Sequence, residues 1–285
     1  MKKIITLLGT IALIVATLST VAAKNKMVQI KGSDTMVNLV QTWAEKYMEK
    51  NTGKFIAVTG GGSGTGLSSL ISGTCDIAMS SRNIKEKEIE LAKNKNIEPF
   101  EIKVALDGLA VVVNPANPVS NLTTDQLAGI FTGTITNWKE VGGNDQKIVV
   151  LSREVNSGTH VYFKEHVLRK LDARSKEEFA PGALMLSSSQ AIAEEVSGNS
   201  GAIGYYGMGY ISSRQKAIAV APNNTSEYVA PVIENVISGK YPISRPLFIY
   251  TNKTPQGDIK AFIDYALSVE GQKIVLETDF VPIKQ

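Results

Sequence analysis

Cysteine and histidine are scarce in this chain, and both shortages exclude classes of function. Cys75 is the only cysteine among 285 residues, so no disulfide can form within the chain and the fold depends on an ordinary hydrophobic core. His160 and His166 are the only histidines, and with one cysteine they cannot build a clustered zinc site. We therefore expect neither a metal nor another cofactor.

The chain also lacks a strong excess of either charge. Setting Lys2 and Lys3 aside leaves 28 of the 30 basic residues against 27 acidic ones, a formal charge of +1. No stretch carries the run of Lys and Arg that nucleic acid or anionic lipid requires, so nucleic-acid binding is not expected. If the protein binds an anion, it does so through a local site and not through a global field.

One long apolar run is present, and it lies at the N-terminus. Lys2 and Lys3 precede an apolar stretch over residues 4–18, and small residues follow up to Ala23, which is the pattern of a signal peptide. A retained membrane anchor is the alternative, although the run is marginal for crossing a bilayer. No cysteine lies near Ala23 to carry a lipid. Removing residues 1–23 would leave a soluble, exported chain of 262 residues, enough for one large or two ordinary domains.

Short strands alternate with helices in the first part of the chain. The expected strands are 28–30, 55–59 and 77–80, and the expected helices are 37–50, 67–71 and 85–94. Helix 37–50 carries apolar residues at the spacing of an amphipathic helix. Such alternation predicts an α/β domain with a mostly parallel sheet, in which ligands bind beyond the carboxyl ends of the strands.

The second part of the chain continues the pattern. The expected strands are 109–113, 148–151, 202–205 and 247–250, and the expected helices are 124–131, 159–168, 189–196 capped by serines at 187–189, 259–267 and 272–276. Residues 221–246 hold four of the ten prolines, and we expect little regular structure there apart from a short helix near 231–238.

Three strand-to-helix loops share one chemical character. They are residues 32–36, the glycine-rich stretch 60–66, and residues 153–159. Each offers hydroxyls and backbone N–H groups near a helix start, and the third adds the guanidinium of Arg153, so together they suit a dehydrated tetrahedral oxyanion. The same residue types are common in helix caps and turns, which is the alternative for any single loop. A fourth candidate is Ser81 with Arg82, although Arg82 could instead be an exposed cap of helix 85–94.

With these loops in place, the chain resembles the periplasmic phosphate-binding proteins of ABC-type phosphate-uptake systems, in the periplasmic binding protein family. The matching segments, in chain order, are 32–35 (Gly-Ser-Asp-Thr), 60–66 with 76–82, 135–138 (Ile-Thr-Asn-Trp), 153–159 and 201–205. The resemblance implies a two-lobed α/β fold. Each lobe would be a mostly parallel sheet flanked by helices, and two crossing strands near 105–109 and 245–248 would join them. Lobe 1 would hold residues 24–105 and 247–285, and lobe 2 residues 106–246.

The resemblance also implies a set of phosphate-binding residues in the cleft between the lobes. They are Ser33, Asp34, Thr35, Met36, Ser63, Gly64, Ser81, Arg82, Arg153, Ser157, Gly158 and Thr159. Arg153 would be the one strong cation, and hydroxyls and N–H groups of the other loops would complete the shell of donors.

Two departures from the family pattern affect selectivity. Members often carry an aspartate directly after the serine of the fourth loop, which accepts the proton of monohydrogen phosphate and repels sulfate, but Ser81 stands there. They also often carry an aspartate two residues after the cleft arginine, where this chain has Val155. Asp34 is our first choice for the proton acceptor, with Arg82 balancing its charge, and Asp107 at the lobe crossing is the second.

The function implied is that of a monomeric, periplasmic receptor that binds inorganic phosphate and delivers it to a membrane ABC permease. A receptor for sulfate or molybdate is the alternative within this class. A secreted phosphatase-like enzyme is the alternative from another class. The nucleophile elbow of hydrolases needs Gly-x-Ser-x-Gly, with glycine two residues before and two residues after the serine. Ser63 has Gly61 before it but Thr65 after it, and Ser157 has neither glycine, although His160 lies close to the third loop. We therefore expect no enzyme.

Overall fold

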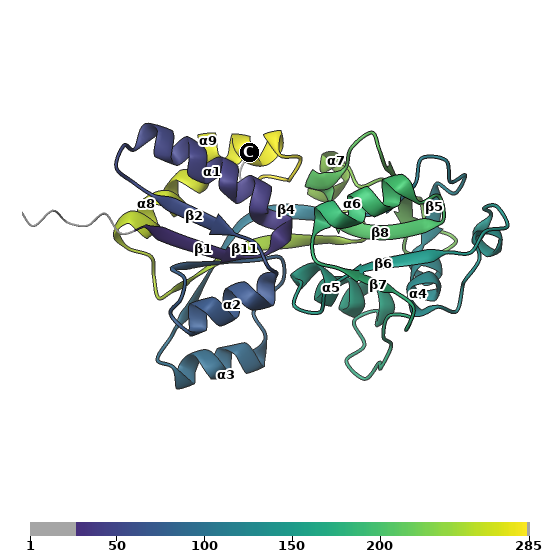
Figure 1. Cartoon of the computed structure of the whole chain (residues 1–285), viewed down its shortest axis with the longest axis horizontal. Helices are drawn as coiled ribbons and strands as arrows, with labels where there is room; N and C mark the ends of the chain where they lie inside the picture. Colours follow the sequence, from purple (N-terminus) through teal and green to yellow (C-terminus); the bar gives the residue numbers. More distant parts are fainter. Residues whose placement is uncertain (1–26, 284–285) are drawn as a thin grey trace, which may run out of the picture.

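The computed structural model describes residues 27–283, and the expected signal peptide at 1–23 lies outside the described residues. A mixed sheet runs through the length of the molecule, and helices cover both of its faces (Figure 1). The strand order along its main path is β2-β1-β3-β11-β4-β8-β6-β7. Between residues 27 and 283, no helix is long and apolar enough to cross a membrane.

The first lobe is built from both ends of the described chain. Its strand β1 (Val28–Gly32) pairs in parallel with β2 (Ile56–Thr59) on one side and with β3 (Ile77–Ser80) on the other. Its helices are α1 (Val37–Lys50), α2 (Ser63–Ile71), α3 (Glu86–Asn94), α8 (Gly257–Ala266) and α9 (Val269–Glu277). Helix α1 begins and ends at the residues predicted, because its apolar face packs on the sheet and against α8 and α9.

The second lobe is built from the middle of the chain. Its strand β6 (Val149–Arg153) lies parallel to β8 (Ala202–Gly207) and to β7 (Leu184–Leu186). Short strands β5 (Asn121–Thr123) and β10 (Ala219–Ala221) form a separate parallel pair, and β9 (Lys216–Ala217) pairs with β4. Its helices are α4 (Thr124–Thr132), α5 (Gly158–Phe163), which continues as a π-helical turn over Lys164–Leu168, α6 (Ser189–Gly198) and α7 (Ile233–Ile237). Single 3-10 turns span Asp34–Met36, Trp138–Val141 and Met208–Tyr210.

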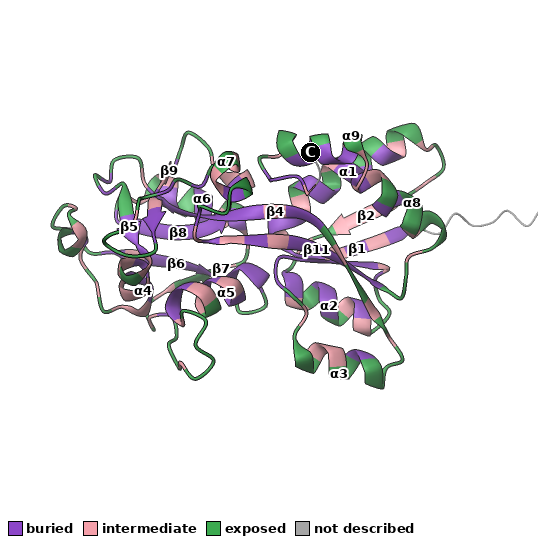
Figure 2. Cartoon of the chain, turned by 180° about the vertical axis from the view of Figure 1, so that it is seen from behind, coloured by how far each residue is buried: buried purple, intermediate pink, exposed green. Residues whose placement is uncertain are grey.

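Two long antiparallel strands pass from one lobe into the other (Figures 1 and 2). They are β4 (Pro99–Val113) and β11 (Ser244–Asn252), and their pairing shifts register between Leu247 and Phe248. Beyond the crossing, β4 pairs with β8 in the second lobe. The sequence predicted only the parts 109–113 and 247–250 of these strands. The start of β4 was missed because residues 99–104 alternate charged and apolar side chains along a half-exposed stretch.

Buried apolar residues form separate clusters on the two sides of the crossing. One pair of clusters is drawn from residues 28–105 and 247–280, and the other from residues 109–243 with Val281. The buried colour in Figure 2 follows the central strands and the inward faces of the helices that cover them. The division into 24–105 with 247–285 and 106–246 stays a prediction; Val281, beside Leu106, packs with the second lobe.

The glycine-rich stretch behaves differently from the expectation. Helix α2 begins at Ser63, one turn before the predicted start at Leu67, so half of the supposed loop is helical. Gly61 and Gly62 make the turn, with φ of 115° and 94°. Gly66 instead allows close packing, because a Cβ there would lie 2.6 Å from the Cα of Gly32. The glycines therefore serve both a sharp turn and a close helix-to-strand contact.

Candidate functional site

The three predicted loops meet at the crossing, where the lobes face each other. Thr35 Oγ1 of the first loop lies 2.8 Å from Thr159 Oγ1 of the third, and Gly64 N–H of the second donates to Asn156 O at 2.9 Å. The hydroxyl-bearing residues Thr35, Ser63, Ser157 and Thr159 are at most 3% exposed. Buried hydroxyls from three separate elements therefore share one water-excluded place between the lobes.

Arg153 stands at the carboxyl end of β6 and is 1% exposed. Its Nη1 donates to Ser189 Oγ at 3.0 Å and lies 3.2 Å from Asp34 Oδ2, and its Nη2 donates to Ser187 O at 2.9 Å. Burial lowers the pKa of Arg153, and the negative charge of Asp34 opposes that shift. The guanidinium is therefore held rigidly with its charge inside the crossing.

Asp34 faces the second lobe, and Arg153 is its cationic partner. Asp34 Oδ2 accepts from Ser189 N–H at 2.7 Å, at the start of α6, and its backbone carbonyl accepts from Tyr210 OH at 2.8 Å. No described residue donates to Oδ1, which leaves one carboxylate oxygen available.

The expectation that Arg82 balances Asp34 is wrong. Arg82 makes a two-pronged ion pair with Glu88, in the first turn of α3, with N···O distances of 2.8 and 2.7 Å, and also donates to Asn83 O. Burial raises the pKa of Glu88, but the hydrogen bonds from Arg82 and from Lys85 N–H outweigh this, so the pKa is lowered overall. Arg82 is also buried, not an exposed cap of the helix.

The remaining predicted residues lie around the crossing in supporting positions. Ser63 Oγ accepts from Ser81 N–H at 3.0 Å, which ties the second loop to the fourth. Ser33 and Met36 close the 3-10 turn of the first loop through Met36 N–H and Ser33 O, at 3.1 Å. Gly158 packs so closely on the second loop that a Cβ there would lie 2.7 Å from Ser81 Oγ and nearer still to Ser63 Oγ.

Sequence reasoning missed a second arginine at the site. Arg245, near the start of β11, donates Nε and Nη2 to Asp107 Oδ2 at 3.1 and 2.9 Å, and both side chains are buried. Its Nη2 also donates to Thr159 Oγ1 at 2.9 Å. Arg245 lies in the proline-rich segment, where no motif marks it, and only its place at the lobe crossing could have drawn attention to it.

The buried arginines keep N–H groups without a protein acceptor. Arg153 Nε, Arg245 Nη1 and Arg82 Nε have no hydrogen-bond partner within the described part of the chain. An unpaired buried donor costs about 1–3 kcal/mol, so such groups are rare unless they serve a purpose. Two of the three arginines adjoin the loops with buried hydroxyls, which is the chemistry of an anion site.

His160 lies behind this site and is not placed for catalysis. Its Nδ1 is 3.3 Å from Ser152 Oγ, which is 2.7 Å from Tyr205 OH, and all three residues are buried. Burial lowers the pKa of His160 to about 4, with nearby Lys164 contributing, so the imidazole is neutral near pH 7. Ser152, His160 and Tyr205 present no exposed face through which a substrate could reach the Ser152 hydroxyl.

We expect stability to fall as the pH decreases towards 5, because His160 is neutral in the folded chain. Between about pH 6.5 and 4, the unfolded chain binds a proton at this position that the folded chain does not, so unfolding becomes easier as the pH falls. Chemical denaturation should show a loss of about 2 kcal/mol between pH 7 and pH 5. H160Q should reduce this dependence of the free energy of unfolding on pH. A dependence as steep as in the wild type would contradict the attribution of the effect to His160.

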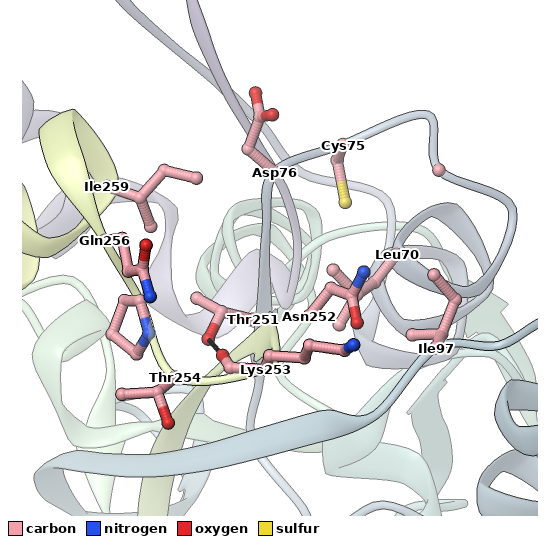
Figure 3. Close-up of a pocket in the computed structure, with 12 residues that line it drawn as sticks. Leu70, Cys75, Asp76, Ile97, Thr251, Asn252, Lys253, Thr254, Gln256 and Ile259 are labelled. Atoms are coloured by element: carbon pink, nitrogen blue, oxygen red, sulfur yellow. Dashed lines mark hydrogen bonds between the residues drawn. The ribbon is translucent and has the colours of Figure 1, made fainter.

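A cavity of about 500 Å³ lies elsewhere, near the start of β3 in the first lobe (Figure 3). Cys75, Asp76 and Lys253 line it together with apolar and neutral polar residues. Burial raises the pKa of the Cys75 thiol to about 11, so this cysteine is a poor nucleophile. Asp76 accepts from Gln29 N–H at 2.9 Å. None of the described arginines lines this cavity, in contrast to the crossing.

Comparison with known proteins gives the family. A family model described as a PBP superfamily domain matches residues 16–270. The phosphate-binding protein PstS of Bacillus subtilis is 37% identical over 255 residues, covering 89% of this chain and 80% of the relative. The phosphate-binding protein PstS of Pseudomonas aeruginosa is 32% identical over 269 residues, covering 88% of this chain and 81% of the relative.

Solved structures agree with this relationship. A phosphate ABC transporter substrate-binding protein from Clostridium perfringens, solved with bound phosphate, has a TM-score of 0.81 at 34% identity and covers 91% of this chain and 100% of its own. An ABC-type phosphate transport receptor from Vibrio cholerae has a TM-score of 0.70 at 36% identity, covering 89% of this chain and 99% of its own. The chain therefore belongs to the PBP superfamily and, within it, to the PstS family of phosphate-binding proteins.

Proposed function

We propose that this protein is an extracytoplasmic receptor that binds inorganic phosphate between its lobes and delivers it to an ABC permease. The observation that carries the proposal is the meeting of three donor loops with the buried guanidinium of Arg153. The names of its relatives support it, since they are phosphate-binding proteins and one was solved with bound phosphate.

The chemistry of the crossing suits a dehydrated phosphate ion. Phosphate presents four oxygens and needs many donors once water is removed, and the site supplies hydroxyls, N–H groups and a guanidinium. Exclusion of water strengthens each of these bonds, because the local dielectric is low. The ligand would therefore favour the arrangement in which the lobes are closed around it.

The proposed binding residues fall into two groups. Direct donors to the anion would be Thr35, Ser63, Arg153, Ser157, Gly158 and Thr159. Ser33, Asp34, Met36, Gly64, Ser81 and Arg82 would shape the loops that carry those donors, and Asp34 would also contact the ligand. In this structure Gly64 N–H is already occupied by Asn156 O, and Arg82 by Glu88.

The expected cellular context follows from the family. The receptor would act outside the cytoplasmic membrane as a monomer, in the periplasm after removal of residues 1–23. It would carry out no reaction of its own, since the relatives are named as binding proteins and His160 is sealed behind the site. The closed, loaded form would be the one that the permease recognises.

Calorimetry separates the proposal from its alternatives. The mature chain would be titrated with phosphate, sulfate and molybdate, and then assayed for hydrolysis of a phosphate ester. Tight binding of phosphate without turnover is expected. Equal or tighter binding of sulfate or molybdate would indicate a receptor for a different oxyanion, and turnover that is lost in H160Q would indicate an enzyme.

Asp34 is the residue we propose as acceptor of the phosphate proton. Within residues 27–283 its Oδ1 receives no hydrogen bond, whereas Asp107 receives bonds from Arg245 at Oδ2 and from Met208 N–H at Oδ1. A carboxylate that faces an unprotonated oxygen repels it, so sulfate, which carries no proton near neutral pH, would be disfavoured.

D34N should therefore narrow the preference for phosphate over sulfate. The ratio of the two dissociation constants is expected to shrink by about tenfold or more, which corresponds to roughly 1.4 kcal/mol of lost repulsion. Because the variant also loses the ion pair with Arg153, this ratio and not the phosphate affinity alone is the informative measurement. D145N, at a position whose side chain is 72% exposed, is the matched control. An unchanged ratio would rule out Asp34 as the acceptor.

A further inference from the structure

Arg245 is held in a fixed position at the point where β11 enters the second lobe. Its guanidinium is anchored on Asp107 by two hydrogen bonds, and its Cζ lies 5.4 Å from the centre of the Tyr162 ring. Tyr162 OH in turn donates to Ser244 O at 2.6 Å, next to Arg245 in the chain. The side chain is therefore fixed from two sides before it reaches Thr159.

The contact between Arg245 and Thr159 determines which way the Thr159 hydroxyl can donate. Arginine N–H groups can only donate, so Thr159 Oγ1 must accept from Arg245 Nη2. The single proton of the Thr159 hydroxyl must then go elsewhere. Thr35 Oγ1, 2.8 Å away, or an oxygen of a bound anion can accept it. If Thr35 accepts that proton, its own hydroxyl proton becomes available to the anion.

The other hydroxyls of the site show the same arrangement. Ser63 Oγ accepts from Ser81 N–H, and Ser157 Oγ accepts from Thr159 N–H at 3.2 Å. In each case a fixed N–H group occupies a lone pair of the hydroxyl. The proton of Ser157 is then left for a ligand, and that of Ser63 for a ligand or for Ser81 Oγ at 3.3 Å. Thr159 differs because its fixed donor carries a full charge and comes from the crossing strand.

We propose that Arg245 is a positioning residue of the phosphate site, at the head of a donor chain that runs from Arg245 through Thr159 to Thr35 and the bound anion. This inference rests on the proposed function. The charged donor polarises both hydroxyls in the same direction, and successive hydrogen bonds strengthen one another in a low dielectric. This series of hydrogen bonds includes one residue from the crossing strand, one from the second lobe and one from the first lobe, so it is complete only when the lobes are together.

A double-mutant cycle tests whether Arg245 acts through the hydroxyl of Thr159. Phosphate dissociation constants would be measured by calorimetry for the wild type, R245K, T159V and the double variant, with melting temperatures as a check of folding. Lysine keeps a positive charge opposite Asp107 but lacks the fork that reaches both Asp107 and Thr159. R174K, at a position whose side chain is 92% exposed, is the matched control.

R245K should weaken phosphate binding by about tenfold in the wild-type background and by less than about twofold in the T159V background. Equal losses in both backgrounds, or no loss in the wild type, would overturn the inference. If R245K does not fold, the same cycle is run with D107N/R245Q, which removes both buried charges together. Its loss of phosphate affinity must likewise be smaller in the T159V background than in the wild-type background. Failure of the wild type itself to bind phosphate would instead refute the proposed function.

Discussion

R153Q is expected to weaken phosphate binding by about a thousandfold, the largest effect of any substitution at the site. Arg153 is buried, begins the third loop and lies 3.2 Å from Asp34 of the first loop. Hydrogen bonds to a charged partner contribute about 1.5–3 kcal/mol each, and an arginine can give two at once. The loss of two such bonds corresponds to about three powers of ten in the dissociation constant. Calorimetry with phosphate would measure it.

The neighbouring carboxylate requires a control, because R153Q leaves Asp34 without its cation. An unpaired Asp34 would repel phosphate and could by itself account for weak binding. In the D34N/R153Q double variant that repulsion is gone, and we still expect binding at least a hundredfold weaker than in the wild type. R153K should fall between the wild type and R153Q, because it keeps the charge but not the planar fork. A double variant within tenfold of the wild type would contradict a direct role for Arg153.

Local patterns were sufficient to predict most of the elements and the meeting of the first two loops. The apolar spacing of α1 and the cap of α4 by Thr123 are encoded within a few residues, so both helices begin where predicted. The first and second loops lie together because the parallel strands β1 and β2 end at the same edge of a sheet, which is a property of the fold class. The third loop follows β6 in the other lobe, and its place opposite them came only from the family resemblance. The resemblance also assigned Arg153 and Thr159 to the phosphate site, and both lie in this third loop.

The partners of the charged residues could not be predicted in the same way. Asp34 and Arg153 are far apart in the chain and meet only because the lobes do. Arg82 is six residues from Glu88, but whether it turns towards α3 or towards the cleft depends on how α3 packs. Arg245 lies in a segment without periodicity, and its role follows only from the register of β11 against β4, which sets it opposite Asp107.

The early start of α2 has a similar explanation. Glycine is a poor helix former, and a stretch with five glycines among seven residues therefore predicts a loop. Tertiary contacts outweigh that preference here. A Cβ at position 66 would clash with Gly32, and Gly64 N–H donates to Asn156 of the other lobe. The helix thus begins at Ser63, which brings its hydroxyl to the crossing.

G158A is expected to weaken phosphate binding by about a hundredfold or more by holding the lobes apart. The added Cβ would lie 2.7 Å from Ser81 Oγ and closer to Ser63 Oγ, both buried in the first lobe, so the loops cannot keep their present separation. Overpacking of this kind costs about 1–3 kcal/mol, and loss of the donor geometry adds to it. Alanine favours a helix more than glycine by about 1 kcal/mol, so α5 itself should not be weakened.

Two measurements together locate this effect at the interface between the lobes. Calorimetry gives the affinity for phosphate, and small-angle scattering gives the radius of gyration with and without phosphate. In G158A the protein should remain expanded at phosphate concentrations that compact the wild type, while its melting temperature without phosphate changes little. G198A is the matched control, because a Cβ at that glycine meets nothing within 4 Å. Near-normal affinity and compaction in G158A would show that Gly158 does not have to lie against the second loop for phosphate to bind.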